Sequence, residues 1–168
     1  MSMTIAESYR PGAIGAITQM HARYYSAHWG FGPFFEAMVA SELAAFLSRF
    51  NETTDRIWLA LSGEEIVGSL IVDGGEPEAA EFGAHVRLFF LEEAHQGQGI
   101  GREMMRRAVA FCDGFPYQRS YLTTFEGLAH ARRIYDANGY RLVTTQRDRT
   151  WGVEVNEQLF ERLRPAAP

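Results

Sequence analysis

The sequence predicts an α/β fold, in which a mixed, mostly antiparallel twisted sheet carries helices on both faces. Three observations support this prediction. Apolar residues recur at helical spacing in some segments, and they alternate or run continuously over strand lengths in others. These segments follow one another in an order typical of layered α/β proteins. The 168 residues, 46% of them hydrophobic, suffice for a substantial core, so we expect residues 1–168 to form a single domain.

The first half of the chain is expected to contain two helices and an antiparallel hairpin. A short strand is predicted at residues 4–9. Apolar stripes at helical spacing then predict helices over residues 14–27 and 33–50. Strands at 56–61 and 66–73 are joined by a short glycine-containing turn, as in a hairpin.

The strand predicted at residues 81–91 is expected in the middle of the sheet. It follows residues 74–80, whose glycines, proline and glutamates predict an exposed loop. Its centre is apolar on both faces, which is typical of a strand covered on both sides. Strict alternation would place Val86, Leu88 and Phe90 on one face and Phe89 and Leu91 on the other.

The rest of the chain is expected to complete the sheet and its second helical layer. The predicted elements are a helix at 101–112, a strand at 120–124, a helix at 127–138 and strands at 140–145 and 150–155. We expect the strand at 150–155 to end the sheet. The tail, residues 156–163, would then cover that edge or form one side of a two-fold interface.

A glycine-rich turn separates the central strand from the helix at 101–112. Helix N-termini carry unsatisfied N–H groups and a partial positive charge, and glycines let a phosphate group approach the backbone closely. The glycine spacing fits neither the dinucleotide pattern Gly-x-Gly-x-x-Gly nor a Walker loop. The turn therefore suits the pyrophosphate of another cofactor. Its residues are Gln96, Gly97, Gln98, Gly99, Ile100 and Gly101.

Two motifs carry a resemblance to a known family. The turn matches Gln/Arg-x-x-Gly-x-Gly/Ala, the pyrophosphate loop of the GNAT family of N-acetyltransferases, with Gln96, Gly99 and Gly101 at the defining positions. Residues 128–140 resemble the late helix of that family and its exit. The resemblance covers roughly residues 9–163. It is closest to the acetyltransferase half found fused behind MarR-type DNA-binding domains.

The resemblance implies acetyl-CoA as cosubstrate. The pantetheine arm is expected between the strands at 86–91 and 120–124, where main-chain groups would bond it like an added strand. The amides of residues 97–101 would take the pyrophosphate, and Gln96 would brace the turn where the family often has arginine. The other residues expected near the cofactor are Phe89, Phe90, Leu91, Arg102 and Asn138.

The resemblance also implies catalytic roles. Tyr135 would donate a proton to the departing CoA thiolate; the alternative is a core tyrosine with a hydrogen-bonded hydroxyl. An ammonium acceptor must lose a proton before it attacks, and the family often places a carboxylate on the strand before the turn. Here Glu81 and His85 lie on the predicted strand, whereas the position that is most often acidic falls near Gly83.

The acceptor site is expected near the first two helices. Tyr25, Trp29 and Phe31 lie in the region that forms the acceptor wall in GNAT folds, although aromatic residues at helical spacing are also typical of a core. Arg87 is unusual in a central strand, because a buried guanidinium needs a partner. It either holds an acidic residue or recognises a carboxylate of the substrate.

Composition limits the other possibilities. A net charge of −5 disfavours a nucleic-acid surface. The single cysteine, Cys112, excludes an internal disulfide framework and indicates a reducing compartment. The chain shows neither a leader-like segment nor a long apolar run, so we expect a cytoplasmic protein without a membrane partner. The five histidines lack metal-site spacing, so no metal is expected.

The sequence therefore predicts an acyl-CoA-dependent N-acyltransferase. Following the resemblance, it would move the acetyl group of acetyl-CoA to a small-molecule or peptide amine by direct transfer in a ternary complex. The alternative is a catalytically inactive CoA-binding regulatory or interaction module, which Gly83 at the usual acidic position favours. GNAT domains frequently pair, so a homodimer is expected.

Overall fold

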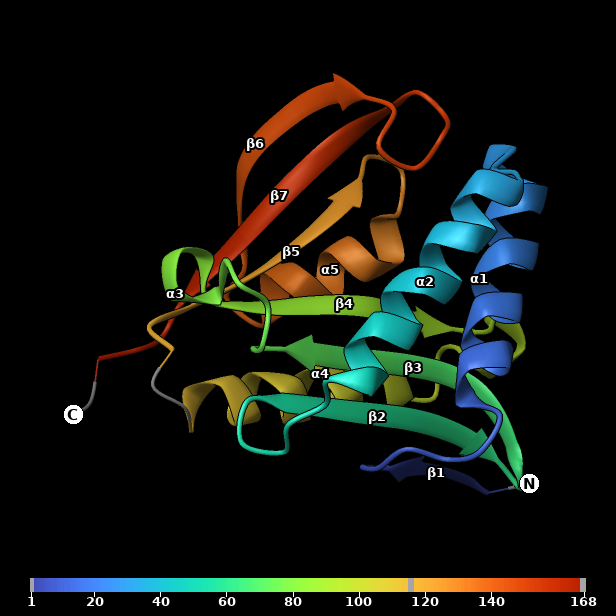
Figure 1. The fold of residues 1–168 in the computed structure, drawn as a ribbon, viewed down its shortest axis with the longest axis horizontal. Helices are drawn as coiled ribbons and strands as arrows, with labels where there is room; N and C mark the ends of the chain where they lie inside the picture. The colour runs from blue at the N-terminus through green and yellow to red at the C-terminus, as the bar shows by residue number, and fades with distance from the viewer. Residues whose placement is uncertain (1, 115–116, 167–168) are drawn as a thin grey trace.

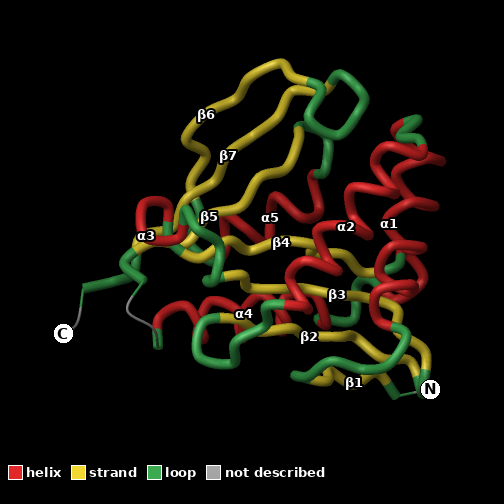
Figure 2. Tube along the Cα trace, viewed as in Figure 1, coloured by secondary structure: helices red, strands yellow, loops and turns green. Residues whose placement is uncertain are grey.

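The computed structural model describes residues 2–114 and 117–166. They form a seven-stranded sheet in the order β1-β2-β3-β4-β5-β7-β6, with helices on both faces (Figure 1). Every strand pairing is antiparallel except that of β4 with β5. The predicted mixed α/β architecture is confirmed. Figure 2 distinguishes the helices from the strands by colour. The strands are β1 (Met3–Ala6), β2 (Asp55–Ser62), β3 (Glu65–Asp73), β4 (Ala84–Leu91), β5 (Arg119–Phe125), β6 (Arg141–Asp148) and β7 (Val155–Leu163).

The helices form a layer on each face of the sheet. One layer consists of α1 (Ala13–Trp29) and α2 (Pro33–Ser48), and the other of α4 (Ile100–Asp113) and α5 (Ala129–Ala137). Two shorter helices, α3 (Ala79–Phe82) and the 3₁₀ turn η1 (Glu93–His95), flank β4. No described helix is long and apolar enough to cross a membrane.

The boundary between α1 and α2 follows from the residue types there. Gly30 directly after α1 has φ 72°, the left-handed conformation that commonly ends a helix. Pro33 begins α2, where its fixed φ and missing N–H suit the first helical position. The chain therefore reverses within a few residues, and both helices pack on the same face of the sheet.

Side chains of β2 alternate between the two apolar clusters of the core. Ile57 and Leu59 face α1 and α2, whereas Trp58 and Ala60 face α4 and α5. All four are almost fully buried. Because burying a large apolar side chain contributes roughly 1.5–3 kcal/mol, this alternation fixes both helical layers to one sheet.

A bulge in β4 changes the orientation predicted for its side chains. The register of β4 against β3 shifts at Leu88, which has φ 49°. The Ser69 hydroxyl donates a 2.7 Å hydrogen bond to the Leu88 carbonyl and so supports the bulge. Val86 packs under α4, whereas Leu88 and Phe90 pack under α1 and α2. The expectation that these three share a face is wrong, because an extra residue interrupts the two-residue period.

Strands β4 and β5 diverge soon after they begin. They pair in parallel only at Ala84–Ser120 and His85–Tyr121. Beyond these pairs β5 continues beside β7, and Figure 1 shows β5, β6 and β7 turning away from β4. The main-chain groups of β4 that face β5 beyond His85 therefore lack a partner strand among the described residues.

The C-terminal hairpin differs from the one predicted. The strand expected at 150–155 begins as a turn, in which Gly152 has φ 87° and its N–H bonds to the Arg149 carbonyl. The tail expected at 156–163 belongs to β7, which lies between β5 and β6. Thr150 and Trp151 have strand propensity, but the left-handed glycine redirects the chain. The edge strand is consequently β6.

Candidate functional site

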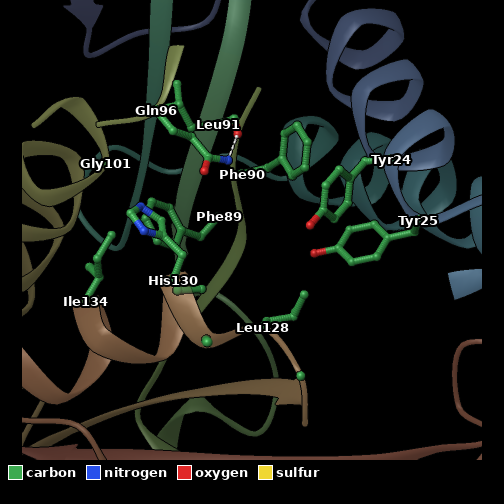
Figure 3. Close-up of a pocket in the computed structure, with 13 residues that line it drawn as sticks. Tyr24, Tyr25, Phe89, Phe90, Leu91, Gln96, Gly101, Leu128, His130 and Ile134 are labelled. Carbon is green, nitrogen blue, oxygen red and sulfur yellow. Dashed lines mark hydrogen bonds between the residues drawn. The ribbon is translucent and has the colours of Figure 1, made fainter. Parts of the chain in front are cut away.

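The divergence of β4 and β5 is accompanied by a slot of about 240 Å³. The end of β4, the start of α5 and two tyrosines of α1 line it. In Figure 3 the hydroxyls of Tyr24 and Tyr25 point toward the space in front of Leu128 and His130. Gln96 and Gly101 also line the slot, so it reaches the glycine turn. The residues of β4 along it are Phe89, Phe90 and Leu91, the three that were expected near the cofactor.

The glycine turn forms an open N-terminus for α4. Gly97 and Gly99 have φ 78° and 83°, and a Cβ atom at either position would meet no atom within 4 Å. Glycine is therefore needed at these two positions for the positive φ and not to avoid a clash, and the space beside the turn is open. Because α4 begins at Ile100, its first N–H groups have no acceptor within the helix. The Gln96 side chain donates a 2.8 Å bond to the Leu91 carbonyl and braces the turn (Figure 3).

A larger cavity of about 400 Å³ adjoins the slot. The two cavities share Tyr25, Phe89, Leu128 and Ala131 in their walls. The larger cavity lies between α1, α2, β4, β5 and the turn that joins β6 to β7. Its ionisable and hydroxyl-bearing wall residues are His21, Tyr25, Glu42, His85, Arg87, Thr123, Thr124, Tyr135, Thr150 and Glu157.

Tyr135 lies in the wall of the larger cavity. Only 6% of the residue is exposed, and burial raises the pKa of its phenol above the usual value. None of the described residues hydrogen-bonds its hydroxyl. The hydroxyl of Tyr140, in contrast, is hydrogen-bonded to the Ser120 hydroxyl at 2.9 Å. Tyr135 is therefore a protonated phenol whose donor remains available to a bound molecule.

Arg87 is held by three carboxylates. Its guanidinium donates to Glu76 at 2.8 Å, to Asp73 at 3.4 Å and to Glu42. These acids come from the loop after β3, the end of β3 and α2. Of the two roles expected for Arg87, the structure shows the first, in which it holds acidic residues. A carboxylate on a substrate would have to compete with three acidic side chains already at this guanidinium.

Glu76 also contacts His85. The Nδ1 atom of His85 lies 3.1 Å from Glu76 Oε2, and the Tyr121 hydroxyl donates to the same oxygen at 3.0 Å. Burial alone would raise the pKa of Glu76, but the bond to His85 and the charges of His85 and Arg87 outweigh it and lower the pKa to about 2. Glu76 is therefore an ionised acceptor within a connected polar group. The described residues contain no group of His, Cys, Asp and Glu side chains suited to a metal ion.

His21 in the same cavity is neutral near pH 7. Burial lowers the pKa of His21 to about 4, and the bond of Nδ1 to the Ile17 carbonyl offsets this only in part. A carbonyl accepts hydrogen bonds but cannot donate them, so Nδ1 carries the proton. A group that binds a proton so weakly is a poor base for an ammonium ion.

The family model described as acetyltransferase (GNAT) family matches residues 14–140. The matched residues include the glycine turn, the diverging strands and α5. The chain belongs to the acetyltransferase (GNAT) family. The recognition of this family from the two sequence motifs is confirmed.

Known relatives and structures agree with the GNAT assignment. A segment of 54 residues is 33% identical to spermine/spermidine N(1)-acetyltransferase of Bacillus subtilis (strain 168); it covers 32% of this chain and 36% of that protein. The match thus spans about a third of the length of this relative. The structure of yncA from Salmonella typhimurium, solved with its cofactor acetyl-CoA, superposes with a TM-score of 0.76 at 15% identity and covers 100% and 98% of the two chains. An acetyltransferase from Thermus thermophilus gives a TM-score of 0.63 at 25% identity over 95% and 96%.

Glu81 does not lie on the strand as expected. It is an exposed residue of α3, which precedes β4. The cause is Gly83, whose φ of 86° separates α3 from β4. A Cβ atom at Gly83 would lie 1.9 Å from the Arg119 carbonyl oxygen, so no acidic side chain fits at this GNAT position. The expectation that Glu81 lies on the strand is wrong, and Glu81 lines neither the slot nor the larger cavity, so the structure does not bring it to the acceptor side of the site.

Other predicted site residues lie behind the cavity walls. Phe31 is 2% exposed and stacks on Tyr25, and Trp29 packs against Phe125. Neither lines the slot or the larger cavity. Phe31 supports Tyr25, which lines both cavities, and Trp29 supports Phe125, which lines the larger one. Asn138 lies after the last residue of α5, where its side chain donates to the Ile134 carbonyl at 2.8 Å. It ends the helix and does not line the slot.

Sequence reasoning missed the acidic residues of the site. Glu42, Asp73 and Glu76 come from three separate elements, and residues 74–80 were predicted to be an exposed loop. The arginine in a central strand signals that acids must be near. It does not indicate which of the 21 acidic residues they are, because only the folded chain brings these three together.

Proposed function

We propose that the protein is an N-acetyltransferase that moves the acetyl group of acetyl-CoA to an amine by direct transfer in a ternary complex. The observation that carries this proposal is the slot beside β4, which reaches an open helix N-terminus at the glycine turn and adjoins a larger cavity. The yncA structure, which shares the fold, contains acetyl-CoA.

The geometry of the slot supports a proposal for the cofactor residues. The pantetheine arm would lie along Phe89, Phe90 and Leu91, bonded by main-chain groups that β5 leaves unpaired. The pyrophosphate would accept hydrogen bonds from amides of residues 97–101, where the helix dipole also favours negative charge. The side chain of Arg102 is exposed beside this site and supplies a positive charge. The proposed reaction requires no metal.

In the proposed chemistry, the base His85 and the acid Tyr135 both line the larger cavity. His85 takes a proton from the acceptor ammonium, and the neutral amine attacks the thioester carbonyl. Tyr135 donates to the departing thiolate. A covalent acetyl-cysteine is disfavoured, because Cys112 is 4% exposed and burial raises the pKa of its thiol to about 12.

The acceptor is proposed to be cationic. Glu42 and Glu157 line the larger cavity, and the positive charge of Arg87 is already matched by three carboxylates. The aromatic ring of Tyr25 adds a surface that suits an ammonium group. The Bacillus subtilis relative is named for spermine and spermidine. We therefore propose a small-molecule polyamine first and a peptide amine second; the chain's net charge of −5 argues against nucleic acid as a partner.

A catalytically inactive CoA-binding module is the second candidate. It is favoured by one observation, the absence of room for a carboxylate at Gly83. In that case the slot would bind CoA, and the larger cavity would serve an interaction without turnover.

Calorimetry and a turnover assay separate these candidates. Acetyl-CoA and CoA should bind, whereas ATP and NAD should not. Release of thiol from acetyl-CoA in the presence of spermidine, other amines, amino acids or peptides should identify the acceptor. Binding of CoA without turnover on any amine would favour the inactive module, and absence of CoA binding would refute both.

The remaining expectations are also proposals. We propose a single domain, a homodimer and a cytoplasmic location. The resemblance to the acetyltransferase half of MarR-type fusions stays a prediction, which rests on similar sequence segments alone.

A further inference from the structure

We propose that Glu76 is a positioning residue that holds His85 in the tautomer whose Nε2 atom is free to accept the proton of the amine. This inference rests on the proposed acetyl transfer and names a residue outside the two sequence motifs. Glu76 lies in the loop between β3 and α3. His85 is the second residue of β4 and lines the larger cavity.

The tautomer follows from the chemistry of the two groups. Glu76 is ionised, since its pKa is lowered to about 2, and an ionised carboxylate only accepts hydrogen bonds. The Nδ1 atom of His85 lies 3.2 Å and 3.1 Å from the two carboxylate oxygens. Nδ1 must therefore carry the proton in this contact. In the neutral ring the lone pair is then on Nε2, and the bond at Nδ1 stabilises the positive charge formed when Nε2 takes a proton.

The carboxylate itself is fixed by other residues. Arg87 donates to Oε1 of Glu76 at 2.8 Å, and the Tyr121 hydroxyl donates to Oε2 at 3.0 Å. Tyr121 also stacks on the His85 ring, with centroids 4.4 Å apart and planes 16° from parallel. Tyr121 thus fixes the orientation of the His85 ring by stacking and the position of the Glu76 carboxylate by a hydrogen bond. This is possible because His85 and Tyr121 are paired neighbours of β4 and β5, where these strands still run together.

The surrounding charges leave Glu76 as the group that acts directly on the imidazole. Asp73, the strand partner of His85 on β3, is bound by Arg49 and Arg87. Glu42 from α2 is bound to Arg87. Of the acids and bases on these elements, only Glu76 has a hydrogen bond to His85 within the described residues.

The reaction balances with these groups. The acceptor ammonium gives a proton to Nε2 of His85, directly or through one water, and its nitrogen lone pair forms the C–N bond to the acetyl carbon. The C–S bond breaks, and the CoA sulfur takes a proton from Tyr135. The nitrogen, positively charged after its attack, gives up its second proton, which restores the Tyr135 phenol, and the proton held by His85 passes to solvent. His85 and Tyr135 return to their starting states when one net proton passes to solvent. Both residues line the larger cavity, so base and acid act on the same space.

The tautomer is tested by NMR on ¹⁵N-labelled protein. Two-bond ¹H–¹⁵N correlations of the imidazole rings, assigned with His85→Gln, should show His85 protonated at Nδ1 in the neutral state. In Glu76→Gln, the side-chain amide is able to donate to Nδ1, and we expect the proton to move to Nε2. The exposed neighbour Glu78 provides the matched control, because Glu78→Gln should leave the tautomer unchanged. A wild-type His85 protonated at Nε2 would overturn the proposal without any need for the variant to fold.

Kinetics test the role of the contact. With spermidine as acceptor, Glu76→Gln should lower kcat by about 10²-fold, the lower end for a lost general base, and leave the KM for acetyl-CoA within a few fold. Glu78→Gln should match the wild type. Equal kcat in Glu76→Gln and wild type would overturn the role of Glu76. If the tautomer shifts as expected but the wild type acetylates no amine, then the proposed acetyl transfer fails and the contact between Glu76 and His85 stands.

Discussion

Tyr135 and Tyr140 are both buried tyrosines in one core cluster, but their hydroxyl groups differ. The hydroxyl of Tyr140 is paired with Ser120, whereas none of the described residues bonds that of Tyr135. The Tyr135 hydroxyl is not among the fully buried polar atoms that lack a partner, and Tyr135 lines the larger cavity, so the hydroxyl is accessible to water or to a bound molecule. The core-tyrosine alternative requires a hydrogen bond to the Tyr135 hydroxyl, which no described residue makes.

Tyr135→Phe is therefore expected to separate catalysis from stability. Removing the hydroxyl should lower kcat by about 10²-fold while acetyl-CoA affinity stays within a few fold. Tyr140→Phe is the matched control: it should lower the free energy of unfolding by about 1 kcal/mol and leave the turnover of folded protein unchanged. Thiol release and urea unfolding measure the two effects. Unchanged turnover in Tyr135→Phe would restore the core-tyrosine interpretation.

His21 should make stability depend on pH. Its pKa is about 4 in the folded state and about 6.5 when unfolded, so the unfolded chain binds more protons between these values. Stability is fully present above about pH 6.5 and should fall as pH decreases toward 4, by up to about 3 kcal/mol. In His21→Gln, which keeps a donor for the Ile17 carbonyl, this decrease should be reduced. The exposed His130 gives the control His130→Gln, and an equal slope in all three proteins would contradict the assignment.

The positions of individual residues were predictable where a motif fixes them. Gln96, Gly99 and Gly101 lie at the turn as expected, because fixed spacing between a strand and a helix determines their position. Glu76 could not be found in this way. Its role depends on His85 and Arg87, and these contacts arise only when a loop folds over the start of β4.

Among the elements, the glycine turn tests the cofactor site most directly. Gly99→Asp adds a negative charge where backbone amides would meet pyrophosphate, and we expect acetyl-CoA affinity to fall by at least about 100-fold, since like charges cost several kcal/mol. The open space around Gly99 should let the variant fold. Calorimetry measures the affinity.

The matched control for this change is Gly99→Asn. Asparagine has nearly the same shape, lacks the charge and tolerates the left-handed conformation better than most residues. Its affinity for acetyl-CoA should decrease by less than about 10-fold. Similar losses in both variants would assign the effect to backbone strain rather than to charge.

The bulge in β4 gives a second prediction for an element. Ser69→Ala removes the donor to the part-buried Leu88 carbonyl, so the free energy of unfolding should fall by about 1 kcal/mol or more. Ser48→Ala removes an exposed hydroxyl on α2 and should change it by less than about 0.5 kcal/mol. Urea titration of both variants measures the difference. An equal loss in the two would show that the serine does not support the bulge.

Elements with a strong period were predicted well, and those set by single backbone conformations were not. The apolar stripes located α1, α2 and α4 closely. Left-handed glycines at 83 and 152 moved Glu81 into α3 and residues 156–163 into β7. A glycine in a sequence permits positive φ without requiring it, so strand boundaries near these positions depended on contacts from other parts of the chain.

At the scale of the molecule, the sheet ends at β1 and β6. Leu142 and Val143 on β6 are 41% and 49% exposed, which leaves apolar side chains on an edge strand. We expect sedimentation to show a dimer at tens of micromolar protein, and Val143→Lys to weaken it because charged residues oppose edge pairing. A wild-type monomer at this concentration would refute the proposed homodimer, whereas the acetyltransferase proposal would survive.

The divergence of β4 and β5 also has a consequence for aggregation. It creates an unpaired strand edge inside the protein, and such edges invite pairing with strands of other chains. Here α5 and Tyr25 of α1 line the space beside this edge, both in the slot and in the larger cavity, so a strand of another chain would have to displace them to pair there. A thin, flexible arm of amides can enter where a polypeptide cannot. The elements proposed to hold the cofactor arm would therefore also protect this inner strand edge from pairing with another chain.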